Sequence, residues 1–291
     1  MSQHAGSTHE LHYPRRADWS PVGAIAPGTL AEARAELHHA AQIANAVGIS
    51  LLAPRPDDSH TNLEWMPATR SLASELVPAV TPFRAAIRAA DLALVLLDET
   101  GAPRAQMPLE GATMNEGFAW LVERVRECGA DASRMTMHKH YQIPRHALDE
   151  GTTFGVGDGV PLRELDRYYG NGDLLLRDLA AREASASPVR CWPHHFDMAT
   201  LITVRADTTI GVGISPGDES FAEPYFYVSP YPYPPASALP ELGQGAWHTT
   251  GFTAAVLTAT ALVRESDGVA QSQLAARFIA DAVVACRRAL G

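Results

Sequence analysis

The sequence predicts an α+β protein in which antiparallel sheets are flanked by helices, and three observations support this fold class. Apolar residues recur every three or four positions within residues 30–47, 114–128 and 268–290, which is the spacing of amphipathic helices. Residues 195–229 instead contain short runs rich in β-branched and aromatic residues, as strands do. Two of these runs are separated only by residues 206–207, and a two-residue connection joins antiparallel neighbours.

The composition indicates a globular chain with a substantial core. Its 291 residues are enough for one large domain or two ordinary ones, and 46% of them are apolar while 19% are charged. The net charge of −10, without any run of five basic residues, argues against general nucleic-acid binding because an acidic surface repels phosphates. No apolar run approaches the length of about 18 residues that a membrane helix needs. We therefore expect a protein that binds neither nucleic acid nor membranes.

The cysteines and the N-terminus indicate the cellular compartment. Cys128, Cys191 and Cys286 are few, odd in number and without C-x-x-C spacing, which is typical of reduced thiols. Residues 1–27 form a polar lead without the apolar segment of a secretory signal. Many alanines, arginines and prolines accompany a single lysine, as in bacterial proteins from GC-rich genomes. We expect a cytoplasmic location.

The first half of the chain is expected to open with a helix. Thr29 and Glu32 have the T-x-x-E spacing of a capping box, and Gly48 stands where a helix would end. An apolar stripe runs between them, with His38 and His39 in its middle. The other expected elements of this half are a strand at 61–66, helical turns at 83–88, strands at 90–97 and 104–109, a helix at 114–128 and a strand at 135–143.

The second half is expected to begin with a helix at Pro161, since proline favours the first helical turn. Gly170-Asn171-Gly172 should interrupt this helix, and Asp173 is suited to cap a second helical segment. The proline-rich residues 230–240 are not expected to form a central strand. The other expected elements are strands at 195–205, 208–215 and 223–229, an extended run at 247–262 and a long helix at 268–290.

The two halves have the same expected order of elements. With residues 1–27 as a lead, residues 28–150 and residues 151–291 each read as a helix, several strands and a helix. This order favours two helix–sheet–helix pseudo-repeats within one compact unit. The alternative is coincidence, because helix–sheet–helix order is common in unrelated proteins.

A distinctive pattern lies in the second half. It reads WPHHFD at 192–197, PGD at 216–218 and EPYFY at 223–227, around a predicted β-hairpin. In this pattern and in its order of elements, the chain resembles an uncharacterised bacterial family of unknown function. The resemblance implies an α+β fold and a site near the pattern, and it carries no reaction mechanism.

His194, His195 and Asp197 are the first candidates for chemistry. If a strand begins at His194, alternation places His195 and Asp197 on one face. An imidazole beside a carboxylate suits a general base, with His195 as the base and Asp197 as its orienter, or two ligands of a divalent metal such as zinc. The alternative is structural: the histidines bond to backbone groups and Asp197 pairs with an arginine.

A second group of candidates follows on a later strand. By the same alternation Glu223, Tyr225 and Tyr227 share one face, and in a common sheet Glu223 can reach His195 or Asp197 as a third metal ligand. Tyrosines beside a carboxylate suit a polar ligand, although tyrosines on a half-buried face also simply pack. The expected substrate-binding set is Trp192, His194, Glu223, Tyr225 and Tyr227.

Three further constellations carry weaker predictions. His138 and His140 form an H-x-H pair on a predicted strand, a spacing found in metal sites, and His146 and His248 are only weak candidates for a third ligand. Cys191 would be a nucleophile only if an adjacent histidine activated it, and cysteine is more often a small buried hydrophobe. Gly211 and Gly213 leave space beside a ligand or mark a bulge, and they do not form the G-x-G-x-x-G loop of a nucleotide site.

These observations predict a protein with a polar pocket of histidine, aspartate, glutamate and tyrosine side chains. It is expected to bind a small molecule or a metal, and a hydrolytic or metal-assisted reaction is the expected class if it is an enzyme. The G-x-S-x-G, H-E-x-x-H and P-loop motifs are absent from the sequence. The alternative is a non-catalytic structural or interaction module, in which residues 221–235 (FAEPYFYVSPYPYPP) pack against a partner.

Overall fold

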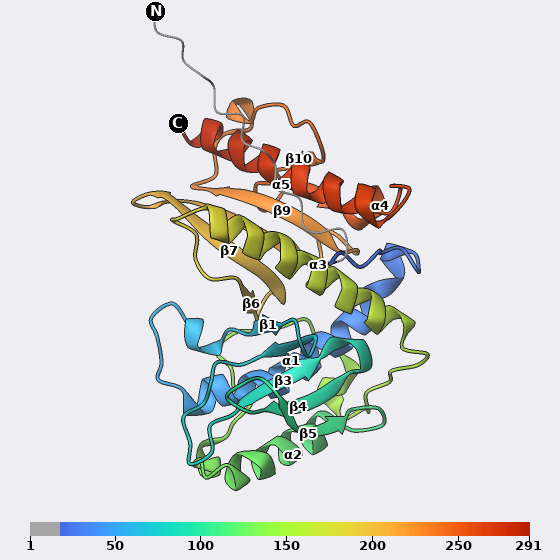
Figure 1. The fold of residues 1–291 in the computed structure, drawn as a ribbon, viewed down its shortest axis with the longest axis vertical. Coiled ribbons are helices and arrows are strands. Elements are labelled where there is room, and N and C mark those ends of the chain that lie inside the picture. Colours follow the sequence, from blue (N-terminus) through green and yellow to red (C-terminus); the bar gives the residue numbers. More distant parts are fainter. Residues whose placement is uncertain (1–17) are drawn as a thin grey trace, which may run out of the picture.

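A computed structural model describes residues 18–291 as two antiparallel sheets with helices packed against them (Figure 1). The first sheet has five strands in the order β1-β2-β3-β4-β5, and the second has six in the order β10-β11-β9-β8-β7-β6. The predicted α+β class is therefore confirmed, while most of the predicted lead lies outside the described residues. No helix within residues 18–291 combines the length and the apolar character that crossing a membrane requires.

The first half supplies two helices and the whole first sheet. Helix α1 (Ala31–Leu51) precedes the sheet and helix α2 (Met114–Glu127) follows it, where Thr113 and Glu116 form a capping box. The predicted helix at 114–128 and strand at 104–109 are thus confirmed. The strands are β1 (Glu64–Met66), β2 (Ser71–Ala73), β3 (Arg84–Arg88), β4 (Ala93–Leu97) and β5 (Pro103–Pro108).

Helix α1 differs from its prediction at both ends. It follows a 3₁₀ turn, Pro27–Leu30, and the Thr29 hydroxyl donates to the Ala26 carbonyl rather than capping the helix. The helix also continues through Gly48 to residue 51. A Cβ at Gly48 would lie 2.8 Å from the carbonyl oxygen of His60, so this glycine permits a close approach of backbone rather than ending the helix.

Two other expectations for the first half are wrong. Residues 84–88 form strand β3 rather than helical turns, because pairing with both β2 and β4 overrides the helix preference of the two alanines in RAAIR. Residues 135–143 form no strand. They are tied to α1 by side chains instead: the Ser50 hydroxyl accepts from the backbone N–H of Thr136, and the Tyr141 hydroxyl donates to Gln42.

The second half supplies the second sheet and three helices. Helix α3 (Val160–Arg182) precedes the sheet, and α4 (Ala259–Leu262) and α5 (Gly268–Leu290) follow it, the last with the predicted bounds. The 206–207 hairpin is also confirmed. The strands are β6 (Arg190–Trp192), β7 (Asp197–Arg205), β8 (Thr208–Ser215), β9 (Tyr225–Tyr231), β10 (Ala246–His248) and β11 (Ala254–Thr258).

Helix α3 is continuous, so the predicted break at residues 170–172 is wrong. A Cβ at Gly172 would lie 2.5 Å from a methyl group of Ile214, so the glycine lets the helix pack closely on the sheet. Asp173 accepts two hydrogen bonds from Arg177 within the same helix instead of capping a new one. Tertiary packing outweighs the cost of glycine in a helix, which is about 1 kcal/mol.

Pro230 lies inside β9, which is a central strand, contrary to the prediction. It pairs with Ile210 of β8. On the other side, the ladder to β11 ends at Val228, so only one neighbouring strand remains at the proline. Its missing N–H is therefore tolerated as it would be at a sheet edge.

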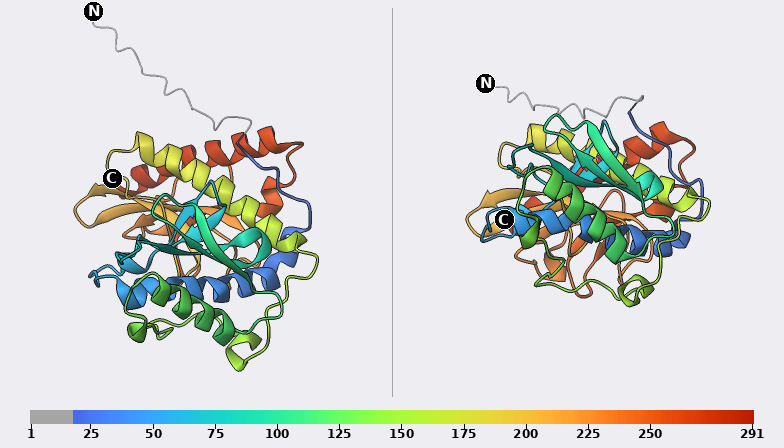
Figure 2. Two further views of the ribbon diagram at one scale, coloured as in Figure 1. Left: turned by 60° about the horizontal axis from the view of Figure 1, so that its bottom comes forward. Right: turned by 90° about the horizontal axis from the view of Figure 1, so that it is seen from below.

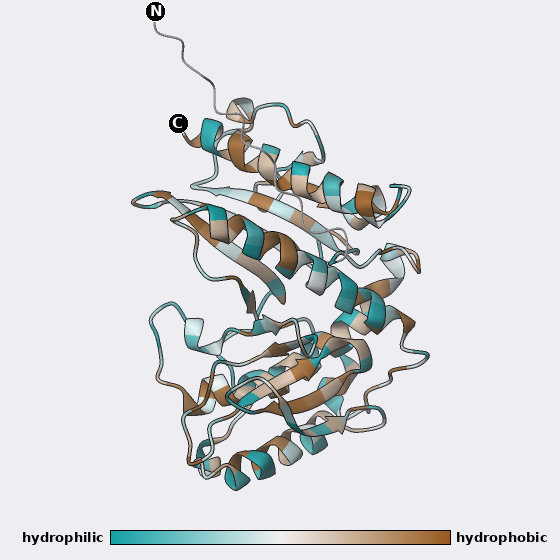
Figure 3. Ribbon diagram, in the orientation of Figure 1, coloured by the Kyte–Doolittle hydropathy of each residue, from teal (hydrophilic) through white to brown (hydrophobic). Residues whose placement is uncertain are grey.

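Helices α3 and α5 cover one face of the second sheet (Figures 1 and 2). That face contributes buried apolar side chains such as Met198, Val212 and Phe226 to the main core. Both helices carry hydrophilic and hydrophobic bands, as burial of one side requires (Figure 3). The opposite face of the sheet carries the polar residues of the candidate site.

The two halves meet at a short antiparallel bridge. Leu63 and Cys191 exchange two backbone hydrogen bonds of 3.0 and 2.8 Å, and both side chains are fully buried. Strands β1 and β6 consequently lie side by side (Figure 1). Both halves run helix, sheet, helix. At the far edge of the second sheet, however, β11 lies next to β9 and β10 lies outermost, so these two strands are in reversed order. The origin of the halves as pseudo-repeats stays a prediction.

Candidate functional site

A cavity of about 570 Å³ lies where the two halves meet. Five of the seven predicted site residues line it, namely Trp192, His194, His195, Asp197 and Tyr227. The second sheet also contributes Arg190 and Gly211, and the first half contributes Arg55, Asn62 and Glu75. The volume lies within the range of about 300–1,000 Å³ that is usual for small-molecule sites.

The wall formed by the second sheet is one face of that sheet. Trp192 pairs with Asp197 across β6 and β7, and Gly213 pairs with Tyr227 across β8 and β9. Side chains alternate along each strand, so Arg190 points to the same side as Trp192. The sheet thus presents polar and aromatic side chains to the cavity on one face and apolar ones to α3 and α5 on the other.

Asp197 carries the carboxyl group of this wall. The Tyr227 hydroxyl donates to its Oδ2, whereas its Oδ1 is buried and has no hydrogen-bond partner within residues 18–291. Burial raises the pKa of Asp197, although the Tyr227 hydrogen bond and the nearby His195 ring act to lower it. A carboxyl group in this state can give or take a proton nearer to neutral pH than an ordinary aspartate.

The contact between Tyr227 and Asp197 depends on Gly213. A Cβ at Gly213 would lie 2.6 Å from both Cζ and the hydroxyl oxygen of Tyr227. The phenol therefore lies over this glycine and reaches from β9 across β8 to the carboxyl group on β7. Burial raises the pKa of Tyr227 well above its usual value, so its hydroxyl stays a hydrogen-bond donor.

His194 and His195 occupy a turn, not the start of a strand. Strand β7 begins at Asp197, and the turn closes through a 2.7 Å hydrogen bond from the N–H of Phe196 to the carbonyl of Trp192. The predicted alternation therefore does not apply to the histidines. Their ring centroids lie 4.3 Å apart, and within residues 18–291 no hydrogen bond joins His195 to Asp197.

The histidine turn is held by contacts that sequence reasoning missed. His38 and Gln42 of α1 both bond to the Pro193 carbonyl, at 2.8 and 2.9 Å. The His38 ring stacks on Phe196 at 4.7 Å, and the Tyr169 hydroxyl donates to the Phe196 carbonyl. Phe196 has a φ of 59°, which costs about 1–2 kcal/mol for a residue other than glycine, and these contacts maintain it.

Burial also lowers the pKa of His38 to about 4, so this imidazole is neutral at pH 7. A neutral ring can donate from Nε2 to the Pro193 carbonyl, as the contact requires. The signal in the sequence was the pair His38 and Gln42, two polar residues four positions apart within the apolar stripe of a helix.

Asn62 is a second residue that sequence reasoning missed. It is only 2% exposed, lines the cavity, and its side-chain oxygen has no hydrogen-bond partner within the described part of the chain. Because Leu63 pairs with Cys191, antiparallel pairing places Asn62 beside Trp192. Asn62 and Asp197 therefore flank Trp192, about 10 Å apart at two strand spacings.

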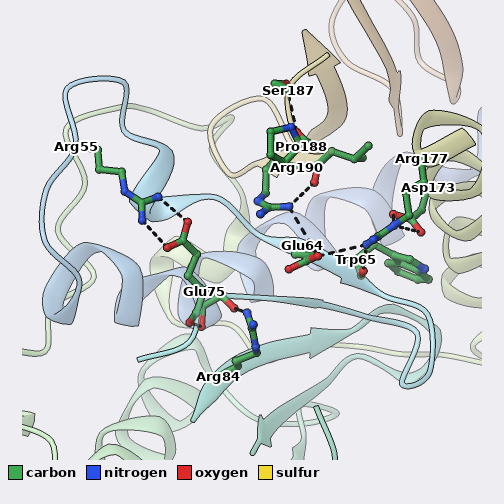
Figure 4. Close-up of polar contacts among 12 residues, drawn as sticks. Arg55, Glu64, Trp65, Glu75, Arg84, Asp173, Arg177, Ser187, Pro188 and Arg190 are labelled. Carbon is green, nitrogen blue, oxygen red and sulfur yellow. Dashed lines mark hydrogen bonds and ion pairs between the residues drawn. The ribbon is translucent and has the colours of Figure 1, made fainter. Parts of the chain in front are cut away.

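Ion pairs border the cavity (Figure 4). Arg55 binds both carboxylate oxygens of Glu75 at 2.6 and 2.8 Å, and this arginine lowers the pKa of Glu75. Arg190 donates to the Val189 carbonyl at 2.8 Å and lies 3.8 Å from Glu64. The arginines that line the cavity are thus already neutralised.

Glu223 and Tyr225 do not line the cavity. The Glu223 carboxylate accepts a hydrogen bond of 2.5 Å from the backbone N–H of Thr260, at the start of α4. The Tyr225 hydroxyl donates to Asp218 at 2.5 Å. The predicted common face of Tyr225 and Tyr227 is present, with ring centroids 6.1 Å apart, but only Tyr227 reaches the cavity.

The metal-binding predictions find no complete ligand set. Within residues 18–291, no three histidine, cysteine, aspartate or glutamate side chains are arranged to hold a metal ion. His140 of the H-x-H pair lies 3.0 Å from Asp58 and is not on a strand. Burial raises the pKa of the Cys191 thiol well above its usual value, which is the opposite of an activated nucleophile. Binding of zinc stays a prediction.

Comparisons of the chain with protein-family models, with curated proteins and with solved structures find no match. The interpretation of the site therefore depends on its geometry, and the resemblance carried by the WPHHFD, PGD and EPYFY segments remains an expectation.

Proposed function

We propose that the protein binds a small polar organic molecule in the cavity between its two halves. The observation that supports this most directly is the pair of unpartnered buried oxygens, Asp197 Oδ1 and Asn62 Oδ1, on residues that line one cavity. Buried polar atoms are nearly always hydrogen-bonded, and each one left unpaired costs about 1–3 kcal/mol. A ligand that pairs with them would recover this cost.

A reaction on the bound molecule is a second candidate function, and the raised pKa of Asp197 favours it. A buried carboxyl group that holds its proton to higher pH is suited to general acid or base catalysis, as in many hydrolases. In this role Asp197 is the group that transfers the proton, and His195, exposed in the neighbouring turn, modulates its charge. This assignment exchanges the predicted roles of the two residues.

The test of binding uses a variant that fills the cavity without touching Asp197. A Cβ at Gly211 would meet only the Ser229 carbonyl, at 3.9 Å, so Gly211→Leu should fold and project its side chain into the cavity. Thr209→Leu is the matched control, because it lies two residues away on the same strand and face but does not line the cavity.

Wild type and both variants would be screened against a library of common metabolites by thermal shift. We expect at least one compound to raise the melting temperature of the wild type and of Thr209→Leu by several degrees, and to leave Gly211→Leu unchanged. If every stabilising compound acted equally on all three proteins, or if none stabilised the wild type, the proposal would fail and the interaction-module alternative would gain support.

A further inference from the structure

If the cavity binds a small molecule, as proposed above, the groups around it indicate which class of molecule it takes. We infer that the ligand is a neutral sugar, whose ring lies against Trp192 and whose hydroxyl groups donate hydrogen bonds to Asn62 and Asp197.

The unpartnered oxygens define what the ligand must supply. Amide and carboxylate oxygens are acceptors, so Asn62 and Asp197 call for donors on two sides of the same molecule. A half-turn about the Cβ–Cγ bond of Asn62 turns its oxygen relative to the cavity, and such terminal torsions are soft, whereas Asp197 is held by the Tyr227 hydroxyl. A molecule with several hydroxyl groups spread around a ring meets both positions at once.

The charges of the cavity favour a neutral ligand. Glu75 is already bound through both oxygens by Arg55, and Arg190 already faces Glu64. Asp57, another carboxylate of the lining, accepts a hydrogen bond of 3.2 Å from the backbone N–H of Ser59 and lies near Arg55. A strongly anionic molecule would therefore find no unpaired arginine among these groups, whereas hydroxyl groups can both donate to the carboxyls and accept from the arginines.

Trp192 provides an apolar surface between the two polar positions. It is half-buried, lines the cavity, and lies between Asn62, which precedes the bridge at Leu63, and Asp197 on β7. The C–H bonds on one face of a sugar ring form a flat apolar patch, and an aromatic side chain can cover this patch while polar neighbours bind the ring's edge. The cavity volume of about 570 Å³ accommodates such a ring.

The test is saturation-transfer difference NMR with two sets of probes of similar size. One set contains neutral sugars (glucose, galactose, mannose and N-acetylglucosamine), and the other contains amino acids and small carboxylic acids. The proteins are the wild type, Gly211→Leu, Asn62→Leu and the control Thr209→Leu. We expect ring-proton saturation of at least one sugar with the wild type and the control. We expect it to be lost in Gly211→Leu and about tenfold weaker in Asn62→Leu, the effect of one lost hydrogen bond to a buried group.

The outcomes separate this inference from the proposed function. If only amino acids or carboxylic acids bind, and Gly211→Leu abolishes their binding, the sugar inference is overturned while the binding site stands. If a sugar binds equally to all four proteins, it binds elsewhere and the inference is overturned. If no probe of either set responds to Gly211→Leu, both the inference and the proposed site lose their support. Because Gly211→Leu does not alter Asn62, a failure of Asn62→Leu to fold leaves the test intact.

Discussion

Strand β9 carries two tyrosine–aspartate pairs with the same chemistry and different surroundings. Tyr225 donates to Asp218, and Tyr227, two residues further along the same face, donates to Asp197. The other oxygen of Asp218 accepts from the backbone N–H groups of Ser220 and residue 221, at 2.8 and 3.0 Å. The other oxygen of Asp197 has no partner within residues 18–291 and belongs to a residue that lines the cavity.

The difference shows how identical side chains acquire different roles. Asp218 lies in the loop of residues 216–224 between β8 and β9, where the following backbone N–H groups satisfy it locally. Asp197 is the first residue of a strand, and no backbone N–H of the residues that follow donates to its Oδ1. The first pair stabilises a turn, whereas the second retains an acceptor that a ligand can use.

The largest expected effect concerns how the turn before Asp197 is held. The folded protein keeps His38 neutral down to about pH 4, whereas the unfolded chain takes up that proton near pH 6.5, so the wild type loses about 3 kcal/mol of stability as the pH falls through this window. His38→Phe keeps the stacking on Phe196 and takes up no proton. We expect the free energy of unfolding that is lost between pH 7 and pH 4, measured with urea, to be about 3 kcal/mol smaller in the variant than in the wild type. Identical losses would show that the turn around Asp197 does not depend on a neutral His38.

The second effect concerns the glycines beneath the tyrosines. Gly213→Ala places a methyl group against the Tyr227 phenol, so we expect a loss of about 2 kcal/mol in the free energy of unfolding and a displaced hydroxyl. Gly211→Ala is the matched control on the same strand, and it should change stability by less than about 0.5 kcal/mol. Chemical denaturation measures both, and equal effects would contradict the role given to Gly213.

The third effect compares the two carboxylates by replacing each with an amide. Asp218→Asn weakens hydrogen bonds to a charged acceptor, and we expect a loss of about 1 kcal/mol at pH 7. Asp197→Asn behaves differently. In the wild type, the unfolded chain loses the Asp197 proton at a lower pH than the folded protein does, so ionisation of Asp197 lowers the stability as the pH rises above about 4. The amide in the variant does not ionise. The variant should therefore gain stability relative to the wild type between pH 4 and pH 7 in denaturant titrations, and a relative loss over that range would be inconsistent with a raised pKa.

The smallest effect concerns the hydroxyl groups. Tyr227→Phe removes the hydrogen bond that lowers the pKa of Asp197, so this pKa should rise further, with a stability cost of about 1 kcal/mol. Tyr225→Phe should cost a similar amount and leave the titration of Asp197 unchanged. Carboxyl-detected NMR titration distinguishes the two variants. If Tyr225→Phe shifted Asp197 as strongly as Tyr227→Phe does, the two pairs would not be independent.

Elements with strong local signals were predictable from the sequence. The amphipathic period of α2 and α5 and the two-residue hairpin between β7 and β8 are consequences of neighbouring residues, and the structure confirms them. The WPHHFD and EPYFY segments also supply five residues that line the cavity. Local patterning also identified the face that Tyr225 and Tyr227 share.

The remaining features depended on partners that are distant in the chain. The continuity of α3 through residues 170–172 depends on the close approach of β8 to Gly172, and β3 replaces the expected helical turns because β2 and β4 pair with it. Asn62 joins the site only because Leu63 pairs with Cys191, more than a hundred residues later. Glu223 leaves the site because the start of α4 supplies it with a backbone donor.

By itself, the sequence determined the α+β class, helices α2 and α5 and the hairpin between β7 and β8, because each follows from the period and the turn residues of a short stretch. Only the tertiary structure decided which of two equivalent aspartates keeps a free acceptor, since that depends on where each carboxylate finds its donors. It also placed Asn62 and His38 around the same turn and cavity. Strand register and long-range pairing set these contacts, and neither is encoded in local spacing.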